Sequence, residues 1–389
     1  MKVYKEPAPN TWNELCERPQ LALEFLESAV RNVLDRVKKS GDDALRELTL
    51  QFDKVEIDQL QVTEAEVQDA MRTLSPELKQ AIQTAAENVE KFHAAQRRDV
   101  MKVETMPGVL CWRKGVAIDK VGIYIPGGSA PLFSTVLMLG VPARLAGCKE
   151  VVLCSPPDKQ GKINPAILFA ANLVGVTKMF KVGGAQAIGA LAFGTQSIPN
   201  VYKIFGPGNQ YVTKAKQLVM EEGLAIDMPA GPSEVLVMAD ESAEPAFVAA
   251  DLLSQAEHGE DSQVILVLNN ENLVKPIQQE IENQLNALPR KAIAEKSLAH
   301  SRVVVFEKNE TALDFINDYA PEHLIINTRN ANEIADQIRN AGSVFIGNYS
   351  PEAIGDYASG TNHTLPTNGY ARAFAGVALE SFMKYITYQ

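Results

Sequence analysis

Gln255 and His258 stand three residues apart in LLSQAEHGED, at the end of an apolar run. Residues at this spacing are neighbours on one face of a helix, so the pair could converge on one metal ion. Asp251 lies one turn earlier on the same polar stripe, and the exposed carbonyls of a helix C-terminus also favour a cation. Glutamine is a rare metal ligand, however, and a solvated polar helix end is the alternative.

Glu322 and His323 are adjacent in YAPEHLII, just before an apolar strand. A carboxylate and an imidazole can share general acid–base work near neutral pH. Consecutive residues of a strand point to opposite faces, so both reach one substrate only if Pro321 holds them in a turn or at the strand entry. The alternative is a surface glutamate beside a half-buried histidine.

The segment GDYASGTNHTLPT (355–367) is rich in glycine, serine, threonine and asparagine and contains Asp356 and His363. A loop of this composition contributes little to stability and is suited to carry a functional site. Asp356 could bring a carboxylate oxygen to a metal ion, and His363 could be a ligand, a substrate contact or a structural hydrogen-bonding group. Ser233, after the Gly–Pro turn of GPSEVLV, has no GxSxG motif, so we expect it to form hydrogen bonds rather than to act as a nucleophile.

Three glycine-rich turns each follow a predicted strand and lead into a predicted helix: IPGGSAP (125–131), VGGAQAIGA (182–190) and FGPGN (205–209). Glycine lets the backbone approach a ligand, and a helix N-terminus offers N–H groups to a phosphate. None of the three fits GxGxxG. Three such turns at equivalent ends of adjacent strands favour a crevice for a nucleotide or cofactor, without indicating which nucleotide.

The elements that must position these residues read as an α/β fold. Runs rich in β-branched residues at 121–126, 150–156, 176–184 and 201–208 recur about every 25 to 30 residues, with helical patterns between them. A second series follows in SEVLVMAD, SQVILVLN, SRVVVFEK, HLIIN and GSVFIGN, while residues 1–118 are predicted to be mostly helical. We expect a discontinuous domain of residues 1–119 plus 235–375 with most metal and catalytic residues, and an inserted cofactor-side domain at 120–234.

Composition limits the class of protein. The 389 residues suffice for two domains, and 37 basic against 48 acidic residues give a net charge of -11, which disfavours non-specific binding to nucleic acid or to an anionic membrane. No apolar run reaches membrane-spanning length, and the N-terminus lacks the apolar core of a signal peptide. Four cysteines without CxxC spacing predict reduced thiols in a cytoplasmic protein.

Seven segments, taken in order, resemble the histidinol dehydrogenase family from about residue 25 to the C-terminus. They are VGIYIPGGSAPL, GGAQAIGALAFGT, FGPGNQYVTKAK, AGPSEVLV, DLLSQAEHG, YAPEHL and GDYASGTNHTLPT. The resemblance implies a zinc- and NAD-dependent enzyme of the last step of histidine biosynthesis. It would oxidise L-histidinol to L-histidine through histidinaldehyde in two successive hydride transfers. It also implies two incomplete Rossmann-like domains and a homodimer with shared active sites.

The resemblance further implies roles for single residues. One zinc ion per subunit would be held by Gln255, His258 and Asp356. His323 would act as acid and base in the alcohol step, and Glu322 would activate water in the aldehyde step. Contacts to substrate are implied for Ser233, Gln255, His258, His323 and Asp356, and contacts to NAD for Tyr124, Gln186 and Asn209. Asp251, on the same helix, has no counterpart in this set.

The sequence departs from the family pattern at its end. Residues 376–389 correspond to the start of a C-terminal tail that in family members continues into a helix with a substrate-contacting glutamate and a zinc-binding histidine; here the sequence ends at Gln389. Two alternatives therefore stay open. One is a metal-assisted hydrolase with Glu322 activating a zinc-bound water, which would leave the glycine turns unexplained. The other is an inactive zinc- or ligand-binding homologue.

Overall fold

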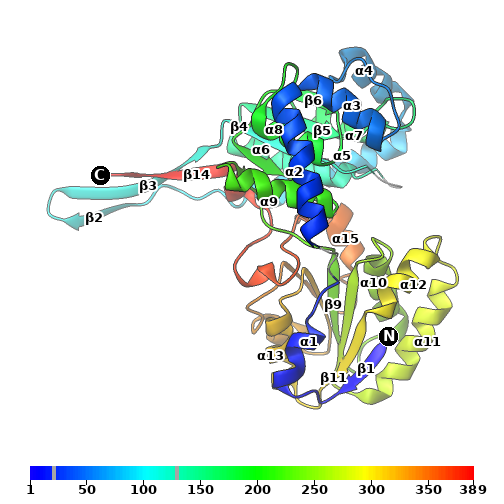
Figure 1. Cartoon of the computed structure of the whole chain (residues 1–389). Coiled ribbons are helices and arrows are strands. Elements are labelled where there is room, and N and C mark those ends of the chain that lie inside the picture. Colours follow the sequence, from blue (N-terminus) through cyan, green and yellow to red (C-terminus); the bar gives the residue numbers. More distant parts are fainter. Residues whose placement is uncertain (20–22, 128–130) are drawn as a thin grey trace. The chain divides into compact units, whose positions relative to one another are not determined.

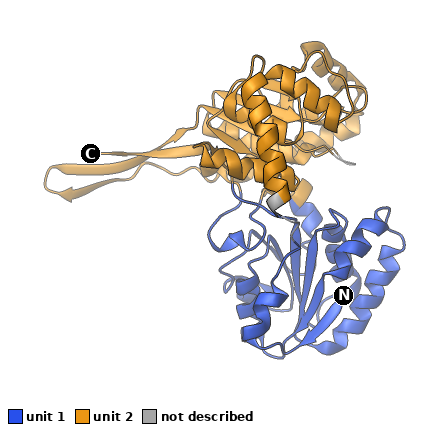
Figure 2. Ribbon diagram, in the orientation of Figure 1, with its two compact units in different colours: residues 1–22, 228–355, 365–376 blue, residues 23–227, 356–364, 377–389 orange. Residues whose placement is uncertain are grey.

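The computed structural model describes residues 1–19, 23–127 and 131–389, which form two compact units (Figures 1 and 2). Unit 1 comprises residues 1–22, 228–355 and 365–376, and unit 2 comprises residues 23–227, 356–364 and 377–389. Residues 128–130, at the centre of the first glycine turn, lie outside the described residues.

A parallel five-stranded sheet forms the centre of unit 2, in the order β6-β5-β4-β7-β8. Its strands are β4 (Lys120–Tyr124), β5 (Glu150–Ser155), β6 (Lys178–Lys181), β7 (Lys203–Phe205) and β8 (Ala225–Ile226). The first four coincide with the runs of β-branched residues in the sequence. Because β5 and β6 extend the sheet on one side of β4, and β7 and β8 on the other, the strand order reverses between β4 and β7.

Two layers of helices pack on this sheet (Figure 1). The first layer consists of α2 (Leu23–Ser40), α3 (Asp42–Phe52), α8 (Gly184–Phe193) and α9 (Gln210–Glu221). The second layer consists of α4 (Glu64–Thr73), α5 (Pro76–Ala94), α6 (Phe133–Ala146) and α7 (Pro165–Val174). Two predicted helix starts are confirmed, because Ser75 and Asn164 accept N–H groups of the first turns of α5 and α7.

The long N-terminal helices belong to unit 2, whereas the sequence led us to expect them beside the second series of strands. The reason is an apolar stripe on α2, formed by Leu26, Val30 and Val37. This stripe joins one apolar cluster with Ile188 and Leu191 of α8. The division therefore falls at residues 22 and 228 instead of 119 and 235, with short later segments also exchanged between the units.

A three-stranded antiparallel sheet, the arm, projects from unit 2 in Figure 1 and contains the C-terminus. It consists of β2 (Lys102–Met106), β3 (Val109–Ala117) and β14 (Met383–Tyr388) in the order β14-β3-β2. A turn at Pro107 and Gly108, with φ +83° at the glycine, joins β2 to β3. Residues 1–118 are mostly helical, as predicted, but strands β2 and β3 were not expected there, and residues 376–389 include a strand that pairs with β3.

Unit 1 contains a six-stranded parallel sheet in the order β1-β11-β10-β9-β12-β13. Its strands are β1 (Lys2–Lys5), β9 (Glu234–Ala239), β10 (Gln263–Leu268), β11 (Arg302–Val305), β12 (His323–Asn327) and β13 (Ser343–Ile346). Its helices are α1 (Trp12–Leu15), α10 (Pro245–Ala256), α11 (Val274–Leu285), α12 (Lys291–Ala299), α13 (Asn309–Tyr319), α14 (Ala331–Ala335) and most of α15 (Glu352–Tyr357). Short β1, which completes one edge, was not expected from the sequence.

Alternating residues of β9 explain why this sheet needs helices on both faces. Val235 and Val237 pack in the cluster that also contains the buried side of α10 to α12. Leu236 and Met238 pack in the cluster on the other face, with α1 and α13. The predicted α/β class with two parallel sheets is confirmed, and the strand order of this sheet reverses between β9 and β12.

Candidate functional site

The glycine turns of unit 2 meet at the carboxyl ends of its strands, where β4 and β7 mark the reversal of strand order. Gly206, directly after β7, has φ +128°, and a Cβ there would overlap the carbonyl oxygen of Tyr124 at the end of β4. Only glycine lets these two backbone segments approach each other this closely. Ligands of open α/β sheets bind in the crevice at such a reversal.

A buried ion pair between Lys216 and Asp227 stabilises the FGPGN loop. Asp227 accepts the N–H of Gly206 at 2.8 Å, and Lys216 donates to the carbonyl of Gly206 at 2.9 Å. Asn209 then caps α9, accepting the N–H groups of Tyr211 and Val212 at 3.1 Å each. The cap uses the side-chain oxygen of Asn209 and leaves its amide NH₂ as the group that a ligand would meet.

Tyr124 links the ends of two neighbouring segments of the same unit. Its hydroxyl accepts the N–H of Gly184, the first residue of α8, at 3.1 Å. Burial raises the pKa of the Tyr124 hydroxyl well above its usual range, so the group stays neutral. Gln186 is buried on the first turn of α8, with its side-chain oxygen folded back toward Gly184. Tyr124 at the end of β4 and the first turn of α8 are thus joined at the carboxyl ends of the strands.

Glu322 and His323 both contact the backbone of one residue of unit 1, Glu234. The N–H of Glu234 donates to Glu322 Oε2 at 2.9 Å, and His323 Nδ1 lies 3.3 Å from the carbonyl oxygen of Glu234. The two side chains lie near each other, with 3.6 Å between His323 Nδ1 and Glu322 Oε2. The turn before the strand therefore brings adjacent residues to one place, as their proposed shared chemistry requires. They lie at the amino ends of β9 and β12, opposite to the usual ligand end of such sheets.

Gln255 is buried near the end of α10, with only 1% of its surface exposed. Among the described residues, neither its amide oxygen nor its amide nitrogen has a hydrogen-bond partner. His258 is exposed and follows the helix, which ends at Ala256 rather than at His258 as expected. Its Nδ1 lies 2.8 Å from the carbonyl of Ser254, so Nδ1 carries the proton and Nε2 is the nitrogen suited to a metal.

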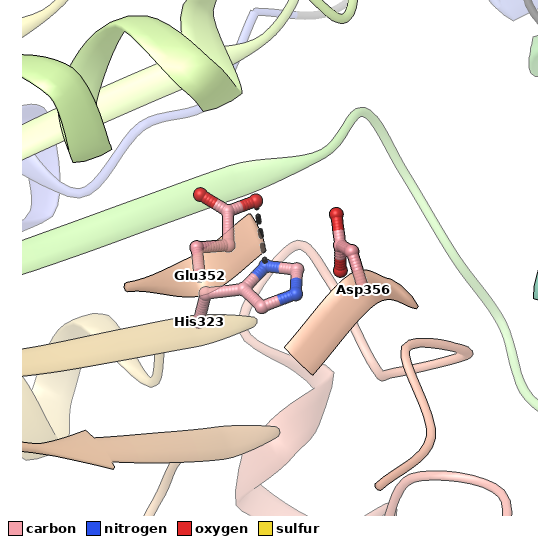
Figure 3. A group of neighbouring side chains, drawn as sticks. All are labelled: His323, Glu352 and Asp356. Atoms are coloured by element: carbon pink, nitrogen blue, oxygen red, sulfur yellow. Dashed lines mark ion pairs between the residues drawn. The ribbon is translucent and has the colours of Figure 1, made fainter. Parts of the chain in front are cut away.

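Asp356 lies one turn after Glu352 on α15, whereas the sequence suggested a loop from residue 355 onward. Figure 3 shows both carboxylates beside the imidazole of His323. One ligand atom of each of these three residues lies within 4.8 Å of the others, and Glu352 Oε1 is 4.0 Å from His323 Nδ1. Sequence reasoning missed Glu352. The i, i+4 carboxylates of PEAIGD were the available signal.

Asp251 anchors the helix that carries these carboxylates. Its side chain accepts hydrogen bonds from the backbone N–H of Glu352, in the first turn of α15, and from the side chain of Asn327. Burial raises the pKa of Asp251 to about 6 in spite of these two hydrogen bonds. Ser254 adds a hydrogen bond of 3.0 Å to Glu352 Oε2. The polar stripe of α10 that we recognised in the sequence thus includes a residue that supports α15.

His363 bridges two polar groups within unit 2. Its Nε2 lies 2.9 Å from the hydroxyl of Thr135 on α6, and its Nδ1 lies 3.7 Å from Asp356 Oδ1. Asn362 fixes the segment by donating to the carbonyl of Met138 at 2.6 Å. Of the three roles open for His363, the structure provides contacts for a hydrogen-bonding one.

A family model described as histidinol dehydrogenase matches residues 16–389. This chain belongs to the histidinol dehydrogenase family. It is 61% identical to "Histidinol dehydrogenase" of Bacteroides fragilis (strain YCH46), over 100% of this chain and 91% of the relative. It is 53% identical to the histidinol dehydrogenase of Salmonella typhimurium, over 98% of this chain and 88% of the relative.

Solved structures agree with the family assignment. A crystal structure of histidinol dehydrogenase from Elizabethkingia anophelis matches with a TM-score of 0.97 and 55% identity, over 100% of this chain and 90% of that one. An acetylating aldehyde dehydrogenase from Geobacillus thermoglucosidasius matches with a TM-score of 0.51 and 15% identity, over 94% of this chain and 96% of that one, which indicates a similar fold only.

Two further observations complete the description of this member of the histidinol dehydrogenase family. All four cysteines are free thiols. Within the described parts of the chain, every helix is too short or too polar to cross a bilayer.

The residues named by the resemblance fall into three places: the end of β4 with the starts of α8 and α9, the entry of β12 with the segment before β9 that contains Ser233, and the ends of α10 and α15.

Proposed function

We propose that this protein oxidises L-histidinol to L-histidine through histidinaldehyde, using NAD in two successive steps, as the last step of histidine biosynthesis. The observation that carries the proposal is that the backbone N–H and carbonyl of Glu234 bind Glu322 and His323 side by side. A base for an alcohol and a base for water are the two proton acceptors that such a sequence of steps needs. Relatives up to 61% identical that are histidinol dehydrogenases support the choice of substrate.

The cofactors would be held by two groups of residues. Gln255, His258 and Asp356 would hold one zinc ion per subunit, and Tyr124, Gln186 and Asn209 would contact NAD. When bound, NAD would accept a hydride in each step, and zinc would hold and orient the substrate. The residues proposed to contact the substrate are Ser233, Gln255, His258, His323 and Asp356.

The buried amide of Gln255 supports a polar ligand at the end of α10. A buried polar group without a hydrogen-bond partner costs about 1–3 kcal/mol, which a bound ion or substrate group would offset. His258 presents Nε2, and Asp356 presents a carboxylate beside His323. Imidazole nitrogen and carboxylate oxygen are common zinc ligands, so the donor types fit zinc, with glutamine the unusual member.

His323 would act in the alcohol step. Its Nδ1–H donates to the carbonyl of Glu234, which makes Nε2 the basic nitrogen. In the proposed step the alcohol proton passes to Nε2 as the carbinol hydrogen leaves with its electron pair as hydride. The hydrogen bond to Glu234 holds the ring orientation during this transfer.

Glu322 would act in the aldehyde step. A carboxylate at this position takes a proton from the water that adds to the aldehyde carbon, and the hydrate then loses the second hydride. The N–H of Glu234 binds Oε2 at 2.9 Å, which fixes the position of the carboxylate for this step. One carboxylate and one imidazole thus divide the work between two chemically different protons.

The arm supports the homodimer that the resemblance implies. Its exposed apolar side chains include Val103, Met106 and Leu110, with exposed fractions of 51%, 62% and 48%. An apolar β-ribbon of this kind favours burial against another chain, and a second copy is the occupant we propose. Light scattering of the wild type and of Met106→Glu tests it: a dimer that dissociates in the variant supports the arm interface, and an unchanged dimer contradicts it.

The proposed reaction is tested by mixing the purified protein with L-histidinol, NAD and zinc and following NADH. Formation of NADH and histidine supports the proposal. Water-dependent cleavage of an ester or amide without NAD would favour the hydrolase alternative. Binding of zinc without either reaction would favour an inactive homologue and would overturn the proposal.

A further inference from the structure

Arg18 is a charged side chain buried in unit 1, with 8% of its surface exposed. Its guanidinium binds the carboxylate of Glu234 with two parallel hydrogen bonds, Nε to Oε2 at 2.8 Å and Nη2 to Oε1 at 3.1 Å. Glu234 is 1% exposed. A forked pair of this kind fixes the position and the orientation of both groups.

Arg18 also holds the end of the helix before the proposed catalytic pair. Nη2 donates to the carbonyl of Tyr319 at 2.6 Å, and the guanidinium lies 3.7 Å from the centroid of the Tyr319 ring. The next residue, Ala320, has φ +52°, an uncommon conformation for a residue with a side chain. Two residues later the chain reaches Glu322, so Arg18 contacts the turn that delivers Glu322 and His323 to the strand.

Arg18 therefore contacts two residues, Glu234 and Tyr319, that each help to position Glu322 and His323. Its first partner, Glu234, supplies the N–H and the carbonyl that bind Glu322 and His323. Its second partner, Tyr319, ends the helix that leads into them. The hydroxyl of Tyr319 donates to Gln263 Oε1 at 2.9 Å, which fixes the ring under the guanidinium.

Stability alone explains this arrangement poorly. Removing two charges from water is expensive, and apolar residues of similar volume often stabilise a core as well as a buried ion pair does. We propose that Arg18 is a positioning residue, which acts through Glu234 and the Tyr319–Ala320 turn to hold Glu322 and His323 in their reactive positions. This inference rests on the proposed function for the roles of Glu322 and His323.

Steady-state kinetics of Arg18→Lys and Arg18→Ala provide the first test. A displacement of about 1 Å can cost about 100-fold in rate, so we expect Arg18→Ala to lower kcat by about 10- to 100-fold with KM for histidinol changed by less than about threefold. Lysine retains the charge without the fork, so Arg18→Lys should recover part of the loss. Both hydride steps should be slowed, because both proton acceptors are held by the backbone of the same residue, Glu234.

Arg302→Ala is the matched control. Arg302 holds the same N-terminal segment, donating to the carbonyls of Leu15 and Glu17 at 2.8 and 3.2 Å, but it is not among the residues that bind Glu234. We expect this variant to lose stability and to keep the kcat of the wild type. Equal loss of kcat in Arg302→Ala and Arg18→Ala would mean that Arg18 only anchors the segment, and would overturn the proposal.

A double-mutant cycle tests the path through Glu234. Glu234→Gln keeps the volume and removes the fork, and combining it with Arg18→Ala should lower kcat no further than the stronger single change. Multiplied losses would contradict the path, as would Glu234→Gln with unchanged kcat. If Arg18→Ala does not fold, Arg18→Lys and Glu234→Gln test the same statement.

A crystal structure of Arg18→Lys tests the positioning without any activity. We expect the peptide of Glu234 and the ring of His323 to shift by more than about 0.5 Å, the tolerance of a productive site. Unchanged positions would overturn the positioning role. Failure of the wild type to form NADH would instead overturn the proposed function, so the two failures are distinguishable.

Discussion

Replacing Glu322 by glutamine separates the two proposed chemical steps. Glutamine has almost the same volume and keeps one side-chain oxygen as an acceptor for the N–H of Glu234, which binds Glu322 Oε2 at 2.9 Å. The position of the side chain should therefore be preserved. The loss of charge assistance in one hydrogen bond costs at most about 1.5 kcal/mol of folding stability. The protein should remain folded, so a change in rate reports on chemistry.

The expected loss falls on the aldehyde step. An amide does not take a proton from water, and general base catalysis typically contributes about 10²- to 10⁴-fold. The variant should therefore oxidise histidinaldehyde about 10²- to 10⁴-fold more slowly, equivalent to about 3 to 5 kcal/mol of barrier. His323 keeps its hydrogen bond to the Glu234 carbonyl, so the alcohol step should slow by less than about tenfold.

Rapid mixing with enzyme in excess measures both steps. From histidinol, the variant should release one equivalent of NADH quickly and the second very slowly; from histidinaldehyde, it should show only the slow phase. Glu333→Gln, an exposed glutamate on α14, serves as the matched control and should behave as wild type. Equal slowing of both phases would refute the assignment of Glu322 to the aldehyde step, and so would two unaffected phases.

Three further predictions concern metal, pH and NAD. Asp356→Asn should weaken zinc binding at least about 10- to 100-fold, the effect of losing an outer-shell partner, and wild-type affinity by chelator competition would contradict this. Burial raises the pKa of Asp53 from 3.8 to about 6, and its Oδ2 has no hydrogen-bond partner among the described residues. The folded protein then binds this proton more tightly, so wild-type stability falls as pH rises from about 4 to 6. This rise in the pKa of Asp53 corresponds to at most about 3 kcal/mol, which partial exposure of the side chain reduces. Asp53→Asn should therefore raise the free energy of unfolding by about 1–2 kcal/mol above pH 6 and leave it unchanged below pH 4. Thermal melts at both pH values would measure the difference. A difference in stability between Asp53→Asn and the wild type that does not change with pH would refute the raised pKa of Asp53. Tyr124→Phe removes the acceptor of the Gly184 N–H and should raise KM for NAD about five- to tenfold; an unchanged KM would argue against a NAD site there.

The strands and their order of appearance were predictable because β-branched runs and helix caps are local signals. Asn164 and Gly175, for example, mark the two ends of α7 in the sequence and in the structure. The arm was missed although Pro107 and Gly108 mark its turn, since its strands carry many exposed polar residues and lack a long apolar run. Partners in packing were also missed: the apolar stripe of α2 was visible, but the helices α8 and α9 that pack against it were not identified as its partners.

The candidate site was predictable only where its residues are close in sequence. Glu322 and His323 were evident as a pair, and Gln255 and His258 as another. The peptide that holds the first pair belongs to Glu234, and the arginine that holds Glu234 lies at position 18, so both depend on contacts between distant segments. Glu352 was missed because residues 355–357, the end of α15, were assigned to a loop, which hid the one-turn spacing from Glu352 to Asp356.

The amount of NADH formed for each histidine produced from L-histidinol tests the central proposal most directly. Two oxidations from alcohol to carboxylate require two hydride transfers, so we expect two NADH for each histidine, with histidinaldehyde remaining bound between the steps. A ratio well above two, with the aldehyde accumulating in solution, would contradict the account. So would histidinol that stays unchanged in the presence of NAD and zinc.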